Sequence, residues 1–155
     1  MERYIISACL CGVNCKYNGK NNLNKECLKL AKEGKAILVC PEQLGGLTTP
    51  RDPSEKSKNT VITKEGKEVT QNFIYGAKEA LNIANIYNVK KAILKEGSPS
   101  CGVHKIYDGT FSGNKISGMG IFAKLLCKNN IKVISSEEFT LENNKKNVIK
   151  LDKYN

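Results

Sequence analysis

The chain has 155 residues, 40% of them hydrophobic, so it can build one apolar core without disulfide support and we expect a single domain over residues 1–155. Its formal net charge of +10 at pH 7 favours anionic partners such as nucleotides, phosphates or RNA, although an excess of surface lysine from composition alone would give the same charge. Aromatic residues make up only 6% of the chain, which argues against an extended surface for stacking bases.

The first ten residues, MERYIISACL, contain an apolar run that is too short for a secretory signal or a membrane span. We therefore expect a cytoplasmic protein with no membrane contact. Its seven cysteines would then lie in a reducing compartment, where clustered thiols more often bind metal or react than form structural disulfides. The odd number of cysteines also argues against a complete set of disulfides.

The N-terminal third of the sequence predicts two strands that each end at a cysteine. Residues 4–8 (YIISA) predict a buried strand just before Cys9, and residues 36–39 (AILV) predict a second one just before Cys40. A helix capped by Asn24 and ending near residue 33 separates them. The stretch PEQLGGLTTPRDPSE that follows contains prolines and glycines, which predict an active-site loop with little regular structure.

The middle of the chain repeats this arrangement once more. Residues 61–69 predict a small surface hairpin, and residues 70–87, with Thr70 as the cap, predict an amphipathic helix with apolar residues every third or fourth position. Residues 91–95 (KAILK) predict a third strand, which is followed by the loop EGSPSCG with Cys101. Three strands thus each lead to one cysteine.

The last part predicts a loop that contains IYDGTFSG, a helix over residues 118–128, a strand over residues 132–134 and a short helix capped by Ser135 or Ser136. The Lys- and Asn-rich tail after about residue 139 is uninformative. Alternating strands and helices predict an α/β protein with a compact, Rossmann-like three-layer fold, in which helices flank a mostly parallel sheet of about four strands.

Ligands of such sheets bind beyond the carboxyl ends of the strands, where Cys9, Cys40 and Cys101 are expected. Three thiolates there could bind zinc with a fourth ligand, or a 4Fe-4S cluster with one iron left open. The sequence has neither paired CxxC motifs nor a CxxCxxC run, so spacing alone leaves the metal undecided. His104 could be a fourth zinc ligand or a proton donor, although packing in a loop is the more common role.

The remaining cysteines have two interpretations. Cys11 and Cys15 lie in the same loop as Cys9 and could replace it as a ligand, or act as small buried residues. Cys27 and Cys127 occupy apolar positions of predicted helices, so we expect both of them in the core.

Three polar residues lie next to the predicted ligands. Glu42 follows Cys40 by two residues, and its carboxylate could act as a general base or cap backbone amides. Ser98 and Ser100 flank Pro99 before Cys101, where a hydroxyl could bind a substrate or support the loop.

Five segments, SACLCGVNCKYNG, CPEQLGGLTTPRDPSE, GKEVTQNFIYGA, AILKEGSPSCG and IYDGTFSG, together resemble the thiouracil desulfurase (TudS-like) family over nearly the whole chain. The resemblance implies a 4Fe-4S cluster on Cys9, Cys40 and Cys101 and non-redox removal of sulfur from thiolated pyrimidines. It also implies catalytic roles for Glu42 and Ser100. Cys11 is a departure from the family, because many relatives have an aliphatic residue there.

The expected substrate is therefore a small thiopyrimidine: thiouracil, 4-thiouridine or 4-thio-UMP. A water activated by Glu42 would add to the ring carbon while Ser100 orients the ring. The positive net charge favours the nucleotide, with Arg51, Lys95 and Lys105 as candidate phosphate contacts and Ser98 as a further substrate contact. The alternatives are desulfuration of 4-thiouridine in tRNA, and a zinc- or cluster-binding sensor or sulfur carrier without turnover.

Overall fold

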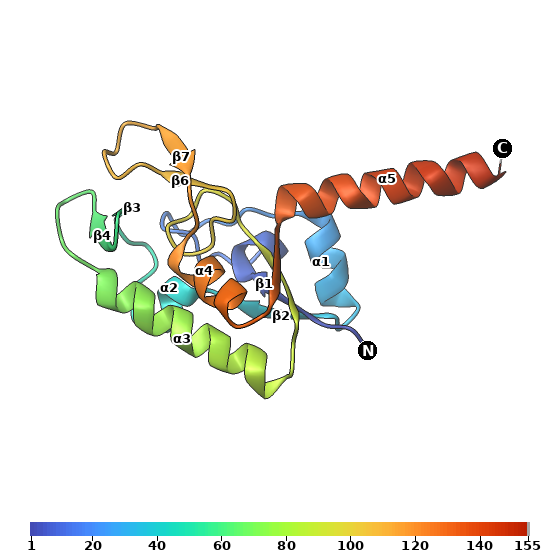
Figure 1. The fold of residues 1–155 in the computed structure, drawn as a ribbon, viewed down its shortest axis with the longest axis horizontal. Helices are drawn as coiled ribbons and strands as arrows, with labels where there is room; N and C mark the ends of the chain where they lie inside the picture. The colour runs from blue at the N-terminus through green and yellow to red at the C-terminus, as the bar shows by residue number, and fades with distance from the viewer. Residues whose placement is uncertain (155) are drawn as a thin grey trace.

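The central element of the fold is a sheet of four parallel strands, in the order β2-β1-β5-β8 (Figure 1). The computed structural model of the protein describes residues 1–154, with side chains as far as residue 150. The strands are β1 (Tyr4–Ser7), β2 (Ala36–Val39), β5 (Lys91–Leu94) and β8 (Lys132–Ser135). The predicted strands are confirmed to within one residue at each end, because each is a run of mostly apolar, β-branched or aliphatic residues, which is typical of strands in parallel sheets.

Helices cover both faces of the sheet, namely α1 (Lys25–Lys32), α3 (Thr70–Ile86), α4 (Ile121–Lys128) and α5 (Ser136–Tyr154). Successive residues of a strand point to opposite faces, so Ile5 packs with α3 and α4 whereas Ile6 packs with Cys27 of α1 and with Phe139 of α5. Both isoleucines are fully buried. The predicted three-layer α/β fold is confirmed.

The stretch after Cys40 is more regular than predicted. Pro41–Leu44 form the short helix α2, which begins with a proline at a position where a missing N–H costs nothing. Further along, β3 (Ser54–Ser57) pairs with β4 (Thr60–Thr63) as an antiparallel hairpin. The prolines between these two elements, Pro50 and Pro53, do lie outside regular structure.

The hairpin predicted over residues 61–69 is present, but it is not a surface element. The backbone N–H of Thr63 donates to the Lys67 carbonyl at 2.8 Å, and that of Val69 donates to the Val61 carbonyl at 2.9 Å. Ile62 and Glu68 form an antiparallel bridge between them. β4 also pairs with β3 before it, which was not predicted. Val61 and Val69 are not surface residues, because both are buried in a small cluster with Phe73 of α3. Thr70 begins α3 rather than capping it.

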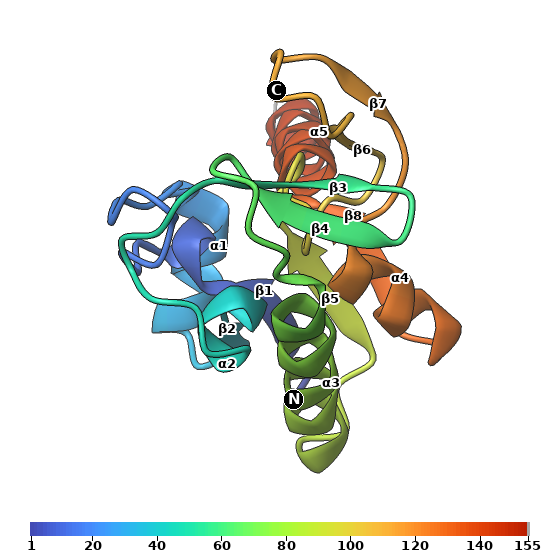
Figure 2. The same ribbon diagram turned by 90° about the vertical axis from the view of Figure 1, so that its left-hand side faces the viewer.

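A second hairpin, β6 (Lys105–Tyr107) with β7 (Lys115–Ser117), was predicted only as a loop. Its strands are three residues long and exposed except at Ile106, so they carry little of the apolar alternation that would reveal them. Figure 2 shows the two hairpins beyond the end of the central sheet, above the start of α3. A hydrogen bond from Gly109 to the Glu55 carboxylate joins them.

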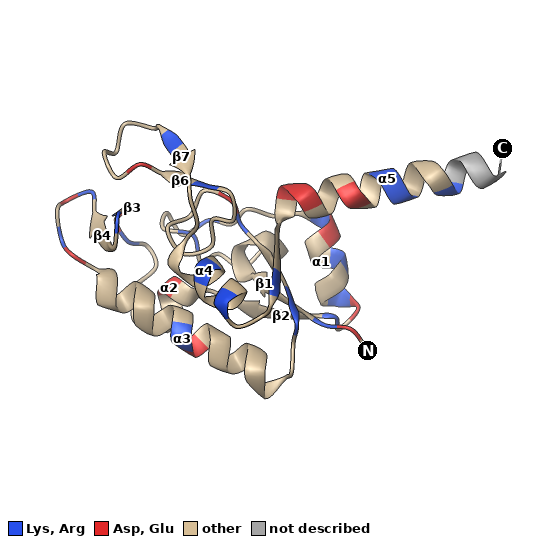
Figure 3. Cartoon of the chain, in the orientation of Figure 1, with Lys and Arg blue, Asp and Glu red and all other residues tan. Residues whose placement is uncertain are grey.

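The C-terminal helix also differs from the prediction. We expected a short helix, but α5 has 19 residues and extends away from the body of the molecule (Figure 1). It is acidic at its start and basic further along (Figure 3). No helix within residues 1–154 combines the length and apolar character that crossing a membrane requires.

Candidate active site

The carboxyl ends of β2, β1 and β5 border a cavity of about 440 Å³. The chain runs from β1 to β2 on one side and then crosses back to β5 on the other, so the strand order reverses between β1 and β5. Open parallel sheets bind their ligands at such a reversal, because the two connections diverge there and leave a crevice. Ser7 at the end of β1 and Val39 at the end of β2 line the cavity.

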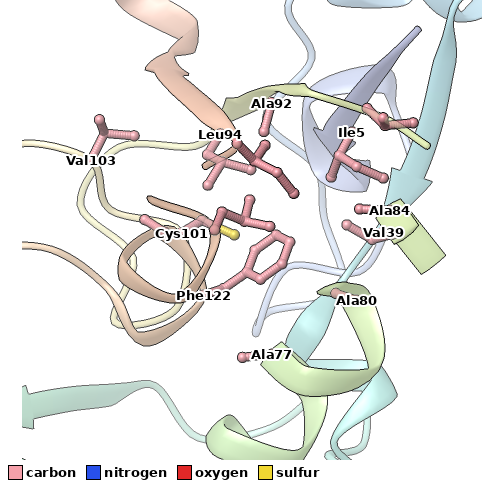
Figure 4. Close-up of a cluster of buried hydrophobic side chains, with 14 residues drawn as sticks. Ile5, Val39, Ala77, Ala80, Ala84, Ala92, Leu94, Cys101, Val103 and Phe122 are labelled. Carbon is pink, nitrogen blue, oxygen red and sulfur yellow. The ribbon is translucent and has the colours of Figure 1, made fainter. Parts of the chain in front are cut away.

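Cys9, Cys40 and Cys101 all line this cavity, each from the segment after a different strand. Burial raises the pKa of Cys9 and of Cys101, and negative charge on neighbouring cysteines raises both further. The amide Nδ2 of Asn22 lies 3.5 Å from the Cys9 sulfur and opposes this effect. The Cys101 side chain lies among apolar core residues, including Leu94 and Phe122 (Figure 4).

Cys15 is a fourth cysteine on the cavity lining, and only 2% of its surface is exposed. A hydrogen bond from the Cys15 thiol lowers the pKa of Cys40 to about 7, and the pKa of Cys15 is raised in return. The Cys40 sulfur also lies 3.9 Å from the Cys15 carbonyl oxygen. Cys15 was predicted as a replacement for Cys9 or as a small buried residue; it is buried, and its contact is with Cys40.

The donor set fits a polynuclear cluster. Three soft thiol ligands converge on one cavity from three neighbouring strands, and the pKa of one of them, Cys40, is lowered by the Cys15 hydrogen bond. Within residues 1–150 there is no group of three His, Cys, Asp or Glu side chains spaced to hold one metal ion. A four-iron cluster makes a different demand, because each thiolate binds its own iron and the sulfurs need not meet at a point.

Glu42 enters the cavity from α2, and its position is fixed from two sides. The Nε of Arg51 donates to Oε1 of Glu42 at 3.2 Å, with 19% of the Glu42 side chain and 8% of the Arg51 side chain exposed. Burial raises the pKa of Glu42, and the Arg51 guanidinium acts against this. On the other side, α2 packs directly on α3. Gly76 of α3 lies so close to Pro41 of α2 that a Cβ atom added to this glycine would be 1.8 Å from the Pro41 carbonyl oxygen.

The two serines before Cys101 have different environments. Ser98 lines the cavity, and its Oγ accepts from the backbone N–H groups of Ser100 and Cys101, both at 3.0 Å, which leaves its own proton free to donate. Ser100 is fully buried, is not among the lining residues, and its Oγ has no hydrogen-bond partner.

Glu96 was not predicted as a site residue, yet it organises the loop that carries Cys101. Its Oε1 accepts from the backbone N–H groups of Gly97, Val103, His104 and Lys105 at 2.7–3.3 Å. These bonds lower the pKa of Glu96 against the opposing effect of burial. The signal in the sequence was a carboxylate directly before a Gly-Ser-Pro loop, where free backbone N–H groups need acceptors.

The basic residues predicted as phosphate contacts are separated by the structure. Lys95 lines the cavity, whereas Lys105 is exposed and outside the lining. Arg51 lines it too, but its guanidinium donates to Glu42, to the Thr48 and Thr49 oxygens and to the Cys15 carbonyl.

Lys16, Lys64 and Lys115 also line the cavity, and sequence reasoning missed them. Lys64 follows β4 and Lys115 begins β7, and their contribution to the cavity depends on tertiary packing that no local motif reveals.

Three further predicted residues lie outside the cavity. Cys11 packs with Cys27 and Leu10 on the α1 face of the sheet, which agrees with its prediction as a small buried residue. Cys127 was predicted in the core, but it is exposed, because α4 turns Phe122 and Leu126 inward instead. His104 is exposed and contacts the Glu138 carboxylate of α5.

Comparison with known proteins agrees with this geometry. A solved structure described as the [4Fe-4S]-dependent thiouracil desulfidase TudS (DUF523) is 40% identical and superposes with a TM-score of 0.85, covering 89% of this chain and 93% of that one. The Uncharacterized protein YbbK of Bacillus subtilis (strain 168) is 42% identical over 144 residues, which are 86% of this chain and 95% of that protein. The model of the 2-thiouracil desulfurase family matches residues 4–138. The chain belongs to the 2-thiouracil desulfurase family, as its motifs predicted.

Proposed function

We propose that the protein is a 4Fe-4S-dependent desulfidase that converts a thiolated pyrimidine and water into the oxo-pyrimidine and hydrogen sulfide. The observation that carries the proposal is one cavity lined by three cysteines from neighbouring strands and by the largely buried carboxylate of Glu42. The 40% identity to a [4Fe-4S]-dependent thiouracil desulfidase supports the same cofactor and substrate class.

Cys9, Cys40 and Cys101 would hold the cluster. When bound, the cluster supplies a Lewis-acidic iron without a protein thiolate, which suits the soft sulfur of a thiocarbonyl group. Burial opposes ionisation of free Cys9 and Cys101, so deprotonation of these thiols is coupled to cluster binding. Cys15 supports Cys40 by a hydrogen bond to its sulfur.

The protein residues would handle protons and orientation. The Glu42 carboxylate accepts a proton from the water that adds to the ring carbon, and Arg51 fixes the orientation of this carboxylate. The Ser98 hydroxyl has a free proton and a place on the cavity lining, so we assign it, in preference to Ser100, to a ring nitrogen or oxygen of the substrate. Addition of water and loss of hydrogen sulfide leave the oxidation state of the ring unchanged.

A phosphorylated substrate such as 4-thio-UMP would gain from Lys95, Lys64 and Lys115 on the lining. Desulfuration of tRNA remains the second candidate, and it would need a continuous basic surface. Lys and Arg are instead spread over most elements and are mixed with acidic residues on α1, α3 and α5 (Figure 3). The small substrate is therefore the better supported of the two.

The test is anaerobic reconstitution with iron and sulfide, followed by incubation with 4-thiouracil in the absence of any reductant. We expect about four irons per chain, and uracil and sulfide in equal amounts. A protein that binds iron or zinc but releases no sulfide from thiouracil, 4-thiouridine or 4-thio-UMP would contradict the proposal and favour a sensor or carrier role.

A further inference from the structure

Phe111 has a backbone conformation that is unusual for a bulky residue. Four non-glycine residues among those described have positive φ: Lys58, Asn88, Phe111 and Asn130. Lys58 lies in the tight turn between β3 and β4, and Asn88 and Asn130 lie just after α3 and α4, positions where such angles are common. Phe111, at φ 57°, is in the left-handed region without being a residue type that tolerates it.

The neighbouring hairpin holds Phe111 in this conformation. Oε1 of Glu55, on β3, accepts from the backbone N–H of Gly109 at 3.0 Å and from that of Phe111 at 3.1 Å. Gly109 allows the close approach, because a Cβ there would lie 2.8 Å from the Cβ of Ser57. Contacts with the neighbouring hairpin, in addition to the hydrogen bonds within its own loop, therefore hold Phe111 in the strained conformation.

Packing in the core does not account for this strain. The clusters of buried hydrophobic side chains among the described residues do not include Phe111, and the residue is only half-buried. It lines the same cavity as Cys9, Cys40 and Cys101. A strained residue that the surrounding structure fixes beside a reaction centre is characteristic of a functional position.

We propose that Phe111 provides the aromatic face on which the pyrimidine ring of the substrate stacks, and that Glu55 is the positioning residue that holds it there. The inference rests on the proposed function and adds to it a residue that determines specificity for planar rings. An aromatic side chain suits this role because every pyrimidine presents a π-face, whether or not it carries a ribose phosphate. Fixing the ring in advance avoids the cost of ordering it when substrate binds.

The test compares Phe111→Leu, Phe111→Gly and Phe111→Tyr in the reconstituted enzyme. We expect the leucine and glycine variants to raise KM for 4-thiouracil roughly tenfold with little change in kcat, because they remove the stacking ring. Phe111→Tyr should keep the wild-type KM. Iron content should be unchanged in all three variants. The Kd for uracil, measured by calorimetry, should rise in parallel with KM.

Thermal unfolding separates this role from a structural one. Phe111→Gly should keep a Tm near that of the wild type, because glycine adopts this φ without strain. Asn130→Gly is the matched control: it relieves the same conformation after α4, outside the cavity lining, and should leave KM unchanged. A fall in Tm with unchanged KM and uracil Kd in Phe111→Leu and Phe111→Gly would overturn the role of Phe111. A wild-type enzyme that releases no sulfide would instead overturn the proposed function.

Discussion

Ionisation of the thiols is the first requirement of the site, and the residues around each cysteine influence it differently. Cys40 has its pKa lowered to about 7 by the Cys15 hydrogen bond, whereas burial raises the pKa of Cys9 and Cys101. Cys9, Cys40 and Cys101 each follow the end of a strand, and this position could be predicted from the sequence. The contact between Cys15 and Cys40 could not be predicted, because it depends on how the loop after Cys9 folds back towards Cys40.

Replacing any one of Cys9, Cys40 and Cys101 by alanine should abolish cluster binding, because a cluster with two remaining protein thiolates is weakly held. The control variants are Cys27→Ala and Cys127→Ala. Cys27 is fully buried on the face of the sheet that α1 covers, so its replacement should lower the free energy of unfolding by about 1–2 kcal/mol but leave the cluster intact. Cys127 is exposed, so its loss should change neither. The absorption spectrum and the iron content of each variant measure cluster binding. A normal cluster in Cys40→Ala would refute the ligand assignment.

Glu42→Gln should retain the cluster and lose turnover. The amide keeps the shape of the side chain and can still accept from Arg51, but it cannot take up a proton from water. General-base catalysis contributes roughly 10²- to 10⁴-fold, so kcat should fall by about that factor. The measurement is sulfide release at saturating thiouracil, normalised to iron content. Turnover at the wild-type rate would leave Glu42 with a purely structural role.

At the scale of elements, apolar runs in the sequence predicted the central strands and α3 well. The short helix and the two hairpins around the cavity, β3 with β4 and β6 with β7, were not predicted. In β1, β2, β5 and α3 the apolar residues follow one another or recur periodically, and such a pattern is a strong signal in the sequence. α2 and the two hairpins are three or four residues long in each segment, and their stability comes from contacts between elements. The Glu55 carboxylate of β3, which accepts from a backbone N–H of the other hairpin, is an example of a contact that no local pattern contains.

Glu96 should stabilise the Cys101 loop through its carboxylate. Glu96→Ala leaves the N–H groups of Val103, His104 and Lys105 without their acceptor and should cost about 2 kcal/mol in the free energy of unfolding. Glu96→Gln should cost less, since its amide oxygen still accepts. Glu65→Ala, in an exposed turn, is the control.

The pH dependence of this contribution follows from the lowered pKa of Glu96. A carboxyl group whose pKa is lower in the folded state stabilises the fold fully above its usual pKa of 4.5. The stabilisation is lost as the pH falls through the lowered value. Denaturant unfolding of the wild type and Glu96→Ala at pH 7 and below pH 4 measures it: the difference between the two should shrink at low pH. An equal difference at both pH values would mean that the carboxylate charge has no role.

At the scale of the whole molecule, the parallel α/β architecture followed from alternating strands and helices, and with it the edge at which the cysteines meet. The strand order did not follow, because β5 pairs with β1 rather than with β2, and only tertiary packing decides this. The length of α5 was also missed, since residues 145–150 are all exposed and bury no apolar face that would mark a helix in the sequence. The net charge of the chain could be counted from the sequence, but the positions of the charged side chains around the cavity could not be predicted from it.

The lysines on the cavity lining support the proposal that the nucleotide is the preferred substrate. A charge-assisted contact to phosphate contributes about 1.5–3 kcal/mol, which corresponds to roughly tenfold to a hundredfold in specificity. Neutral thiouracil gains none of it, so kcat/KM for 4-thio-UMP should exceed that for 4-thiouracil by about this factor. Added salt should reduce the ratio, because Lys64 and Lys115 are exposed to solvent and therefore open to screening.

The two lysines of the second hairpin provide a matched pair of variants. Lys115 lines the cavity, whereas Lys105 is exposed on the neighbouring strand outside the lining. Lys115→Ala should lower the preference for 4-thio-UMP severalfold and weaken its salt dependence, and Lys105→Ala should change neither. The measurement is the ratio of the two kcat/KM values at low and high ionic strength, under anaerobic conditions. Equal ratios for both variants and the wild type would mean that Lys115 does not bind the phosphate. Equal kcat/KM values for base and nucleotide in the wild type would mean that the +10 charge of the chain takes no part in substrate choice.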